Sequence, residues 1–249
     1  MILEEFKLEG NVAILAGCGH SWLKDLGLAL AQAGAAVVSA GPEQRQIESG
    51  IGEIRKLGRK AMAIQTDLTS SREIQKMMDD TLSQFGRIDI LVNHLNLEFG
   101  KPFLEVTEGE WKRVIDTNLT AVFLCSQAVG KHMVAQKAGK IVSIVSGGAE
   151  RGLPNGTAYC ASMGGVVQLT RALALEWART NVRINAVGVG WMENSFAGKK
   201  DDSVAHYIPM RRRARPEDIA PLMIFLASNA SSYLSGQVYF ADGGLMARA

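Results

Sequence analysis

The sequence predicts an α/β protein with a Rossmann-like, doubly wound parallel sheet of seven strands and helices on both faces. Short apolar runs alternate with helix-length amphipathic segments from one end of the chain to the other, which is typical of β-α-β units that build a parallel sheet. The length of 249 residues suits one such unit with a sizeable core. We therefore expect residues 1–249 to form a single domain.

The expected strands are short apolar runs of the kind that parallel sheets bury on both faces. They are Val12–Ala16, Ala36–Ser39, Ala61–Gln65, Ile88–Asn93, Lys140–Val145, Arg183–Val187 and Val238–Phe240. The segment 191–214 has no strong periodicity and is rich in Gly, Lys and Asp. We expect it to leave the sheet and to act as a lid over its edge.

Capping residues mark several of the expected helix starts. Ser70 and Glu73 fit the Ser/Thr-x-x-Glu capping box, in which each member satisfies a free backbone N–H of the first turn. Thr107 and Glu110 fit the same pattern. Pro216 suits the first position of the last helix, where a missing N–H costs nothing. These signals agree with the alternation of strands and helices.

The composition indicates a globular protein with no nucleic-acid or membrane partner. The apolar fraction is 47%, and 27 basic residues against 25 acidic ones leave a formal charge of only +2, so no strongly basic surface is encoded. No segment reaches the ~18 apolar residues of a membrane span, and no signal-peptide pattern is present. An odd number of cysteines without metal-ligand spacing is typical of reduced intracellular thiols: Cys18, Cys125 and Cys160. We expect a cytoplasmic protein without a metal site.

Several motifs together resemble the classical short-chain dehydrogenase/reductase family over nearly the whole chain. In chain order they are Asp67, Asn118 within Asp116-Thr117-Asn118-Leu119, Ser146, Tyr159, Pro216-Glu217-Asp218 and Asp242-Gly243-Gly244. The resemblance implies that Asp67 contacts the adenine of a dinucleotide and that Asn118 anchors a proton-relay water. It also implies that Ser146 orients the substrate and that Tyr159 is the general acid/base.

The glycine-rich turn after the first strand departs from the family pattern. Members of the family have Thr-Gly-x-x-x-Gly-x-Gly there, so that the backbone can approach a pyrophosphate. In this chain Gly17 is retained, whereas Ser21 and Leu23 replace the second and third glycines. We expect Leu23 and the adjacent Trp22 to fill the pyrophosphate seat, although Gly19 leaves open a shifted turn that still binds.

The catalytic positions depart from the pattern at one decisive residue. Met163 follows Tyr159 by four residues, where the family has a lysine. The reference pKa of tyrosine is about 10, and a nearby ammonium is what brings it towards neutrality. The resemblance therefore implies an incomplete tetrad of Asn118, Ser146 and Tyr159. Of the cofactor-binding positions, Gly17, Asp67 and Asn93 are retained.

These substitutions damage cofactor binding and proton transfer, whereas the sheet and helix pattern is intact. We therefore predict a noncatalytic subunit of a hetero-oligomeric short-chain dehydrogenase, of tetrameric form, which binds no cofactor itself and supports a homologous catalytic chain that carries NAD. The helices expected at 107–136 and 157–179 would form the interfaces. The resemblance implies a β-hydroxy or β-keto acyl-CoA substrate for the complex, as in anaerobic toluene degradation.

Two enzyme readings remain open beside this prediction. In the first, the chain is a slow NAD(P)-dependent ketone or alcohol oxidoreductase in its own right, with an altered glycine turn. In the second, it is a cofactor-free enzyme in which Ser146 and Tyr159 hold a carbonyl or carboxylate group. Titration with NADH and NADPH separates the first reading from the others.

Overall fold

All seven strands form one parallel sheet in the order β3-β2-β1-β4-β5-β6-β7, which confirms the predicted fold class. The computed structural model describes residues 1–18, 22–193 and 202–247. The strands are β1 Val12–Cys18, β2 Ala36–Gly41, β3 Ala61–Gln65, β4 Ile90–Leu95, β5 Gly139–Ser146, β6 Val182–Val189 and β7 Val238–Ala241. The strand order reverses between β1 and β4, and such a switch point opens a crevice at the carboxyl ends of the strands.

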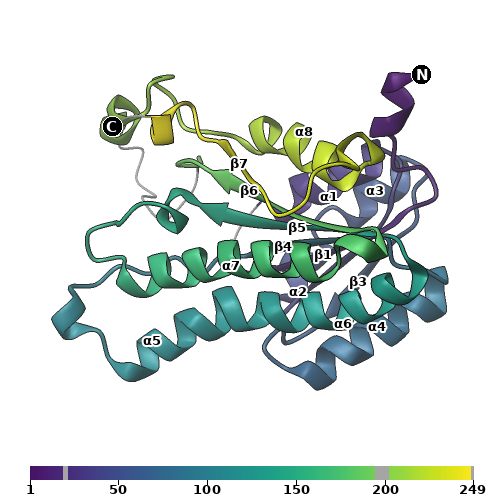
Figure 1. Ribbon diagram of the computed structural model, residues 1–249, viewed down its shortest axis with the longest axis horizontal. Helices are drawn as coiled ribbons and strands as arrows, with labels where there is room; N and C mark the ends of the chain where they lie inside the picture. The colour runs from purple at the N-terminus through teal and green to yellow at the C-terminus, as the bar shows by residue number, and fades with distance from the viewer. Residues whose placement is uncertain (19–21, 194–201, 248–249) are drawn as a thin grey trace.

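Helices cover both faces of the sheet (Figure 1). One layer contains α4, α6 and α7, and the other contains α1, α3 and α8. The helices are α1 Leu23–Gln32, α2 Gln44–Glu48, α3 Ile51–Lys56, α4 Ser71–Phe85, α5 Glu108–Ile115, α6 Ala121–Gln136, α7 Thr157–Glu176 and α8 Pro216–Ala227. None of the helices within the described ranges has both the length and the apolarity that a bilayer crossing needs.

Alternate residues of each strand pack against opposite helix layers. On β1, Ile14 belongs to the core beneath α4, α6 and α7, whereas Leu15 belongs to the core beneath α1, α3 and α8. Both side chains are fully buried, because successive side chains of a strand point to opposite faces. Burial on both faces explains why the strands appear in the sequence as nearly continuous apolar runs.

One predicted capping box forms completely and the other forms in part. Thr107 Oγ1 accepts a hydrogen bond from the backbone N–H of Glu110, and the Glu110 carboxylate accepts one from Thr107 N. Ser70 Oγ likewise accepts from Glu73 N at 3.4 Å. The Glu73 carboxylate, however, accepts from Asp67 N at 2.6 Å, because the turn before α4 brings that N–H within reach.

The segment expected as a lid over the sheet edge leaves the sheet after β6. Met192 forms an isolated parallel bridge with Ala214, and a 3-10 helix spans Asp202–Tyr207. Residues 194–201 of this segment lie outside the described residues. The two ends of the segment therefore lie side by side at the carboxyl end of β6.

Candidate active site

A cavity of about 440 Å³ lies at the carboxyl edge of the sheet. Its walls come from the ends of β5 and β6, the start of α7 and the residues that follow β7. Its lining includes Trp22, Asn96, Glu98, Phe99, Ser146, Arg151, Leu153, Tyr159, Trp191, Met192, Leu245 and Met246. A cavity in this place is where doubly wound proteins bind ligands.

Ser146 and Tyr159 meet on one wall of this cavity. Ser146 is the last residue of β5, and its Oγ accepts a hydrogen bond from Gly148 N at 3.1 Å. Tyr159 lies in the first turn of α7 with 7% of its surface exposed. Burial raises the pKa of the Tyr159 phenol above its ordinary value, hydrogen bonds with Ser146 and Asn96 lower it in part, and the Glu98 carboxylate raises it further. The phenol is therefore protonated at neutral pH.

Met163 lies one turn after Tyr159 on the buried side of α7. It is 1% exposed and belongs to the core between α7 and the sheet. Residues four apart on a helix lie one above the other, so Met163 occupies the place from which a cation would act on the phenol. A thioether has no charge and leaves the raised pKa of Tyr159 uncorrected.

Asn118 lies in a π-helix, Asp116–Thr120, that separates α5 from α6. The single helix expected at 107–136 is therefore interrupted, because the inserted turn brings the Asn118 side chain into the interior. Its Oδ1 accepts from Leu97 N at 2.6 Å, and its Nδ2 donates to Leu97 O at 3.0 Å and to Ser162 Oγ at 3.1 Å. Ser162 Oγ donates to the backbone carbonyl of Tyr159. Asn118 thus ties the loop after β4 to the helix that carries Tyr159.

The described part of the glycine turn is packed. A Cβ added to Gly17 would overlap the Leu23 side chain, so Leu23 lies directly over Gly17. Leu23 and Trp22 are each 3% exposed and belong to the core beneath α1. Ser21 falls within residues 19–21, which lie outside the described residues.

The other two retained cofactor positions have local hydrogen-bond partners. Asp67 is exposed beyond β3, and its Oδ1 accepts from Thr69 N at 2.9 Å and from Thr69 Oγ1 at 2.7 Å. Asn93 is buried near the end of β4, and its Nδ2 donates to Ser126 Oγ and Ser143 Oγ at 3.3 and 3.4 Å. The structure therefore places Asn93 between α6 and β5.

The sequence did not predict that the residues after β7 form one wall of the cavity. Arg151 donates hydrogen bonds to Leu245 O at 3.1 Å and to Met246 O at 2.8 Å, which holds both residues against the cavity. The residues that these bonds join are 94 and 95 positions apart. No local pattern predicts such a contact, and only the closing of the sheet at β7 brings the two segments together.

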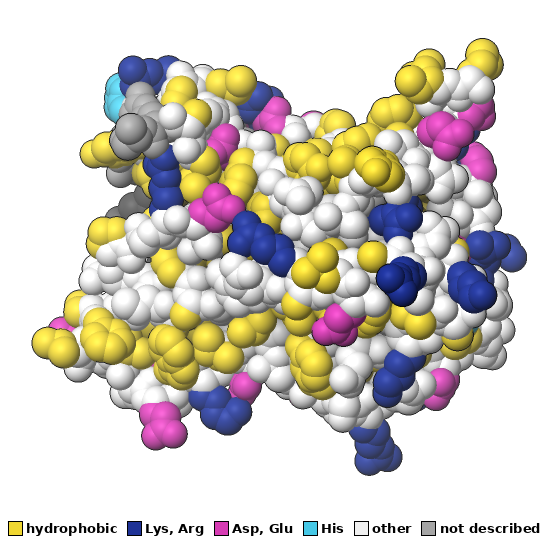
Figure 2. Space-filling view, viewed as in Figure 1, with side chains coloured by type: hydrophobic (Ala, Val, Ile, Leu, Met, Phe, Trp, Pro, Cys, Tyr) yellow, Lys and Arg dark blue, Asp and Glu magenta, His cyan; other side chains and the backbone are white. Residues whose placement is uncertain are grey.

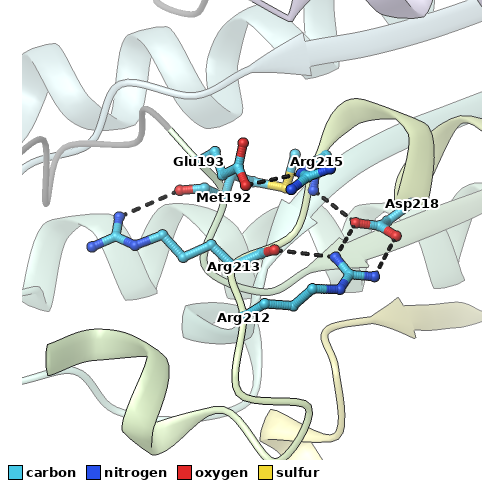
Figure 3. A network of polar contacts seen from close by, with 6 residues as sticks. All are labelled: Met192, Glu193, Arg212, Arg213, Arg215 and Asp218. Carbon is cyan, nitrogen blue, oxygen red and sulfur yellow. Dashed lines mark hydrogen bonds and ion pairs between the residues drawn. The ribbon is translucent and has the colours of Figure 1, made fainter. Parts of the chain in front are cut away.

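Ion pairs and hydrogen bonds hold the two ends of the segment 191–214, which borders the cavity (Figure 3). Arg212 forms a two-pronged pair with Asp218 at 2.6 and 2.8 Å, and Asp218 also accepts from Arg215 N. Arg215 Nε donates to Glu193 at 2.9 Å. Arg213 reaches Met192 O at 3.5 Å. Arg212, Arg213 and Arg215 are therefore engaged with carboxylates and carbonyls of the chain itself.

Comparison with known proteins agrees with this geometry over the whole chain. The family model described as enoyl-(acyl carrier protein) reductase matches residues 24–246. The 2-dehydro-3-deoxy-D-gluconate 5-dehydrogenase of Escherichia coli K12 is 36% identical and covers 100% of both chains. The BbsD subunit of (2S)-[(R)-hydroxy(phenyl)methyl]succinyl-CoA dehydrogenase of Thauera aromatica is 32% identical over 95% of this chain and 97% of its own. The chain belongs to the short-chain dehydrogenase/reductase family.

One solved relative corrects the cofactor prediction. The gluconate 5-dehydrogenase of Burkholderia cenocepacia J2315, solved in complex with NADP and tartrate, is 30% identical, with a TM-score of 0.93 and 100% coverage of both chains. The prediction that this chain binds no cofactor, with NAD only on a partner, is wrong by this comparison. Micromolar binding is worth about 8 kcal/mol, which exceeds the ~1.5–3 kcal/mol needed to expose one leucine. The contact of Leu23 with Gly17 is therefore too weak by itself to exclude a dinucleotide.

Proposed function

We propose that this chain is an NAD(P)-linked oxidoreductase that acts on the carbonyl or hydroxyl group of a substrate bound beside Ser146 and Tyr159. The observation that carries the proposal is the pair of hydroxyls on one wall of a cavity at the carboxyl edge of the sheet. Similarity over the whole chain to named dehydrogenases supports it, including the gluconate 5-dehydrogenase with NADP. Fold similarity alone would not, because one fold serves many activities.

The residues fit a dinucleotide in part. Gly17 lies near the end of β1, close to the crevice, and Asp67 is exposed beyond β3. The Leu23 side chain, however, lies over Gly17. Binding of NAD(P) at this turn therefore requires the Leu23 side chain to move away from Gly17. When bound, NAD(P) supplies or accepts the hydride.

The contribution of the protein is to orient the substrate oxygen and to hold a proton on Tyr159. Because burial raises the pKa of the phenol, Tyr159 Oη is protonated at neutral pH and can donate a hydrogen bond to a carbonyl oxygen, with Ser146 Oγ beside it. A protonated phenol suits carbonyl reduction, in which the oxygen gains a proton. The reverse oxidation needs an ionised phenol, so we propose reduction as the favoured direction.

Titration and turnover test the proposal. Isothermal titration calorimetry with NADH and with NADPH measures binding to the full chain, and loss of NAD(P)H absorbance with a ketone measures turnover. We expect saturable micromolar binding and slow turnover, and we expect Tyr159→Phe to keep the binding and lose the turnover. Absence of both binding and turnover would contradict the proposal.

Met163 favours a second function, in which this chain is a subunit that supports a homologous catalytic chain. A buried phenol without a cation one turn away is a slow proton donor and a poor base. BbsD, one of the relatives, is named as one subunit of its dehydrogenase. Such a complex would act on a β-hydroxy or β-keto acyl-CoA.

Native mass spectrometry separates the two functions. The subunit function predicts a hetero-oligomer when this chain is mixed with a homologous chain that carries Tyr-x-x-x-Lys, together with activity that exceeds that of either chain alone. A mixture that contains only separate proteins would rule it out. Turnover by this chain alone would favour the first function.

A further inference from the structure

We propose that the cavity beside Ser146 and Tyr159 takes a substrate with a bulky apolar body, and not a polyhydroxy acid of the gluconate type. The inference rests on the proposed function and names the substrate class of the same site. It is carried by the chemistry of the cavity walls. The large apolar side chains on these walls are Trp22, Phe99, Leu153, Trp191, Met192 and Met246.

A polyhydroxy acid would find few polar partners in this cavity. Each hydroxyl that leaves water needs a hydrogen bond, or its burial costs free energy. The polar side chains Asn96 and Ser146 both bond to the Tyr159 phenol, so they gather at one point. That point can hold one carbonyl or hydroxyl group and cannot serve a chain of them.

The charged lining residues do not change this conclusion. Arg151 is exposed and directs two hydrogen bonds to the carbonyls of Leu245 and Met246. Glu98 is half-buried, and its carboxylate raises the pKa of Tyr159. Two Arg151 N–H groups therefore bond to carbonyls of the protein itself, and Glu98 lies close enough to act electrostatically on the phenol.

Two indole side chains are among the lining residues of the cavity. Trp22 is buried at the start of α1, and its ring packs against His94 with centroids 4.8 Å apart. Trp191 follows β6, and its ring forms a T-shaped contact with the Tyr207 ring, with centroids 6.3 Å apart and planes at 85°. Aromatic walls held in this way favour apolar and aromatic ligand groups.

Met246 provides an adaptable third wall. A Cβ added to Gly147 would approach Met246 Sδ to 3.1 Å, so the thioether lies against the end of β5. The Arg151 hydrogen bond to Met246 O fixes the backbone at this point. A methionine fills irregular apolar space because its side chain is flexible and polarizable.

Paired titrations of the full chain test the substrate class without any dinucleotide. The probes are 4-phenyl-2-oxobutanoate and 5-keto-D-gluconate, which are both keto acids with different bodies. Calorimetry should give a Kd at least about tenfold lower for the phenyl acid. Tighter or equal binding of 5-keto-D-gluconate, or binding of neither acid, would overturn the inference.

Matched variants locate the binding. Met246→Ala and Trp191→Ala should each weaken binding of the phenyl acid by about tenfold, and Trp191→Phe should restore most of it. Trp111→Ala removes a partly exposed indole on α5, outside the cavity lining, and should leave the Kd unchanged. Equal affinity in all four variants would place the phenyl acid elsewhere and overturn the inference.

The results distinguish failure of the proposed substrate class from failure of the proposed function. Binding of the phenyl acid by a chain that neither binds NAD(P)H nor turns over a ketone would refute the oxidoreductase function and leave the inference standing. Turnover of 5-keto-D-gluconate together with weak binding of the phenyl acid would do the opposite.

Discussion

Leu23 and Gly17 lie in contact at the point where strand β1 gives way to helix α1. Leu23→Ala removes the branched end of the side chain from this contact, so we expect the affinity for NADH and NADPH to rise at least about tenfold. The buried position should also cost about 2–5 kcal/mol in the free energy of unfolding. Calorimetric titration and urea unfolding measure the two effects.

Leu26→Ala is the matched control for this prediction. Leu26 is fully buried one turn further along α1, so its truncation should cost similar stability and leave dinucleotide affinity unchanged. An equal change of affinity in both variants would show that loosening of α1, and not removal of the side chain over Gly17, governs binding.

Met163 is the second residue with a testable consequence. Met163→Lys places an ammonium one turn from Tyr159, which favours the ionised phenol and should lower its pKa. We expect the pH profile of carbonyl reduction, or the ultraviolet titration of the phenol, to move to lower pH. Met163→Gln has similar length without charge and is the control. Identical profiles for the two variants would contradict the electrostatic role assigned to this position.

Some of these residues could be predicted from the sequence and others could not, for physical reasons. Met163 and Leu23 stood out because each replaces a residue type at a fixed spacing. Two features depend on contacts between distant segments: the hydrogen bond between Asn96 and Tyr159 and the position of Met246 on the cavity wall. No rule of residue spacing predicts such contacts. The prediction about the cofactor was wrong because residue spacing does not show whether a side chain such as Leu23 can be displaced.

At the scale of elements, the strands were predicted closely and the helix from 107 to 136 was not. Apolar runs buried on both faces leave a clear pattern, as Val12–Cys18 shows. The π-helix Asp116–Thr120 leaves no such pattern, because one extra residue in a helical turn does not change the composition of the segment. It is nevertheless the element that turns Asn118 towards Leu97 and Ser162.

The start of α8 gives a prediction of acid sensitivity. Hydrogen bonds from Arg212 and from Arg215 N lower the pKa of Asp218 to about 2 from its usual 3.8. A lowered folded-state pKa adds stability that is present above pH ~4 and is lost as the pH falls through about 2. Asp218→Asn should therefore cost about 1 kcal/mol or less at pH 7, after allowance for solvent screening, and should flatten the acid limb.

Urea unfolding between pH 7 and pH 2 measures this effect. Glu217→Gln neutralises the neighbouring carboxylate in the same helical turn and is the control, which should keep the acid dependence of the parent chain. An unchanged slope in Asp218→Asn would show that the pair with Arg212 (Figure 3) contributes no net stability.

At the scale of the whole molecule, a row of exposed apolar side chains crosses part of one face (Figure 2). Figure 2 shows apolar side chains along the lower part of the face on which Figure 1 places α5, α6 and α7. Leu175 on α7 is 82% exposed, and Phe123 on α6 is 42% exposed. Exposed apolar patches of this kind mark contacts with other chains, which agrees with the proposal that these helices form subunit interfaces.

We predict that Leu175→Glu weakens association of the chain with itself or with a homologous chain, because association would bury the carboxylate. Sedimentation velocity should show a smaller mass at equal concentration. Tyr233→Glu alters a fully exposed residue beyond α8 and should leave the mass unchanged. The prediction would be refuted if the parent chain is monomeric and also does not associate with any homologous chain.

The order of the strands has a further consequence for synthesis of the protein. β1 pairs with β4 at the centre of the sheet, where Ala13 lies opposite Ile90, and the Asp89 carboxylate accepts a hydrogen bond from Val12 N. A nascent chain that has passed the ribosome exit only as far as β3 lacks this neighbour. One edge of β1 therefore stays open until β4 emerges, and during that interval a chaperone has an apolar strand to protect.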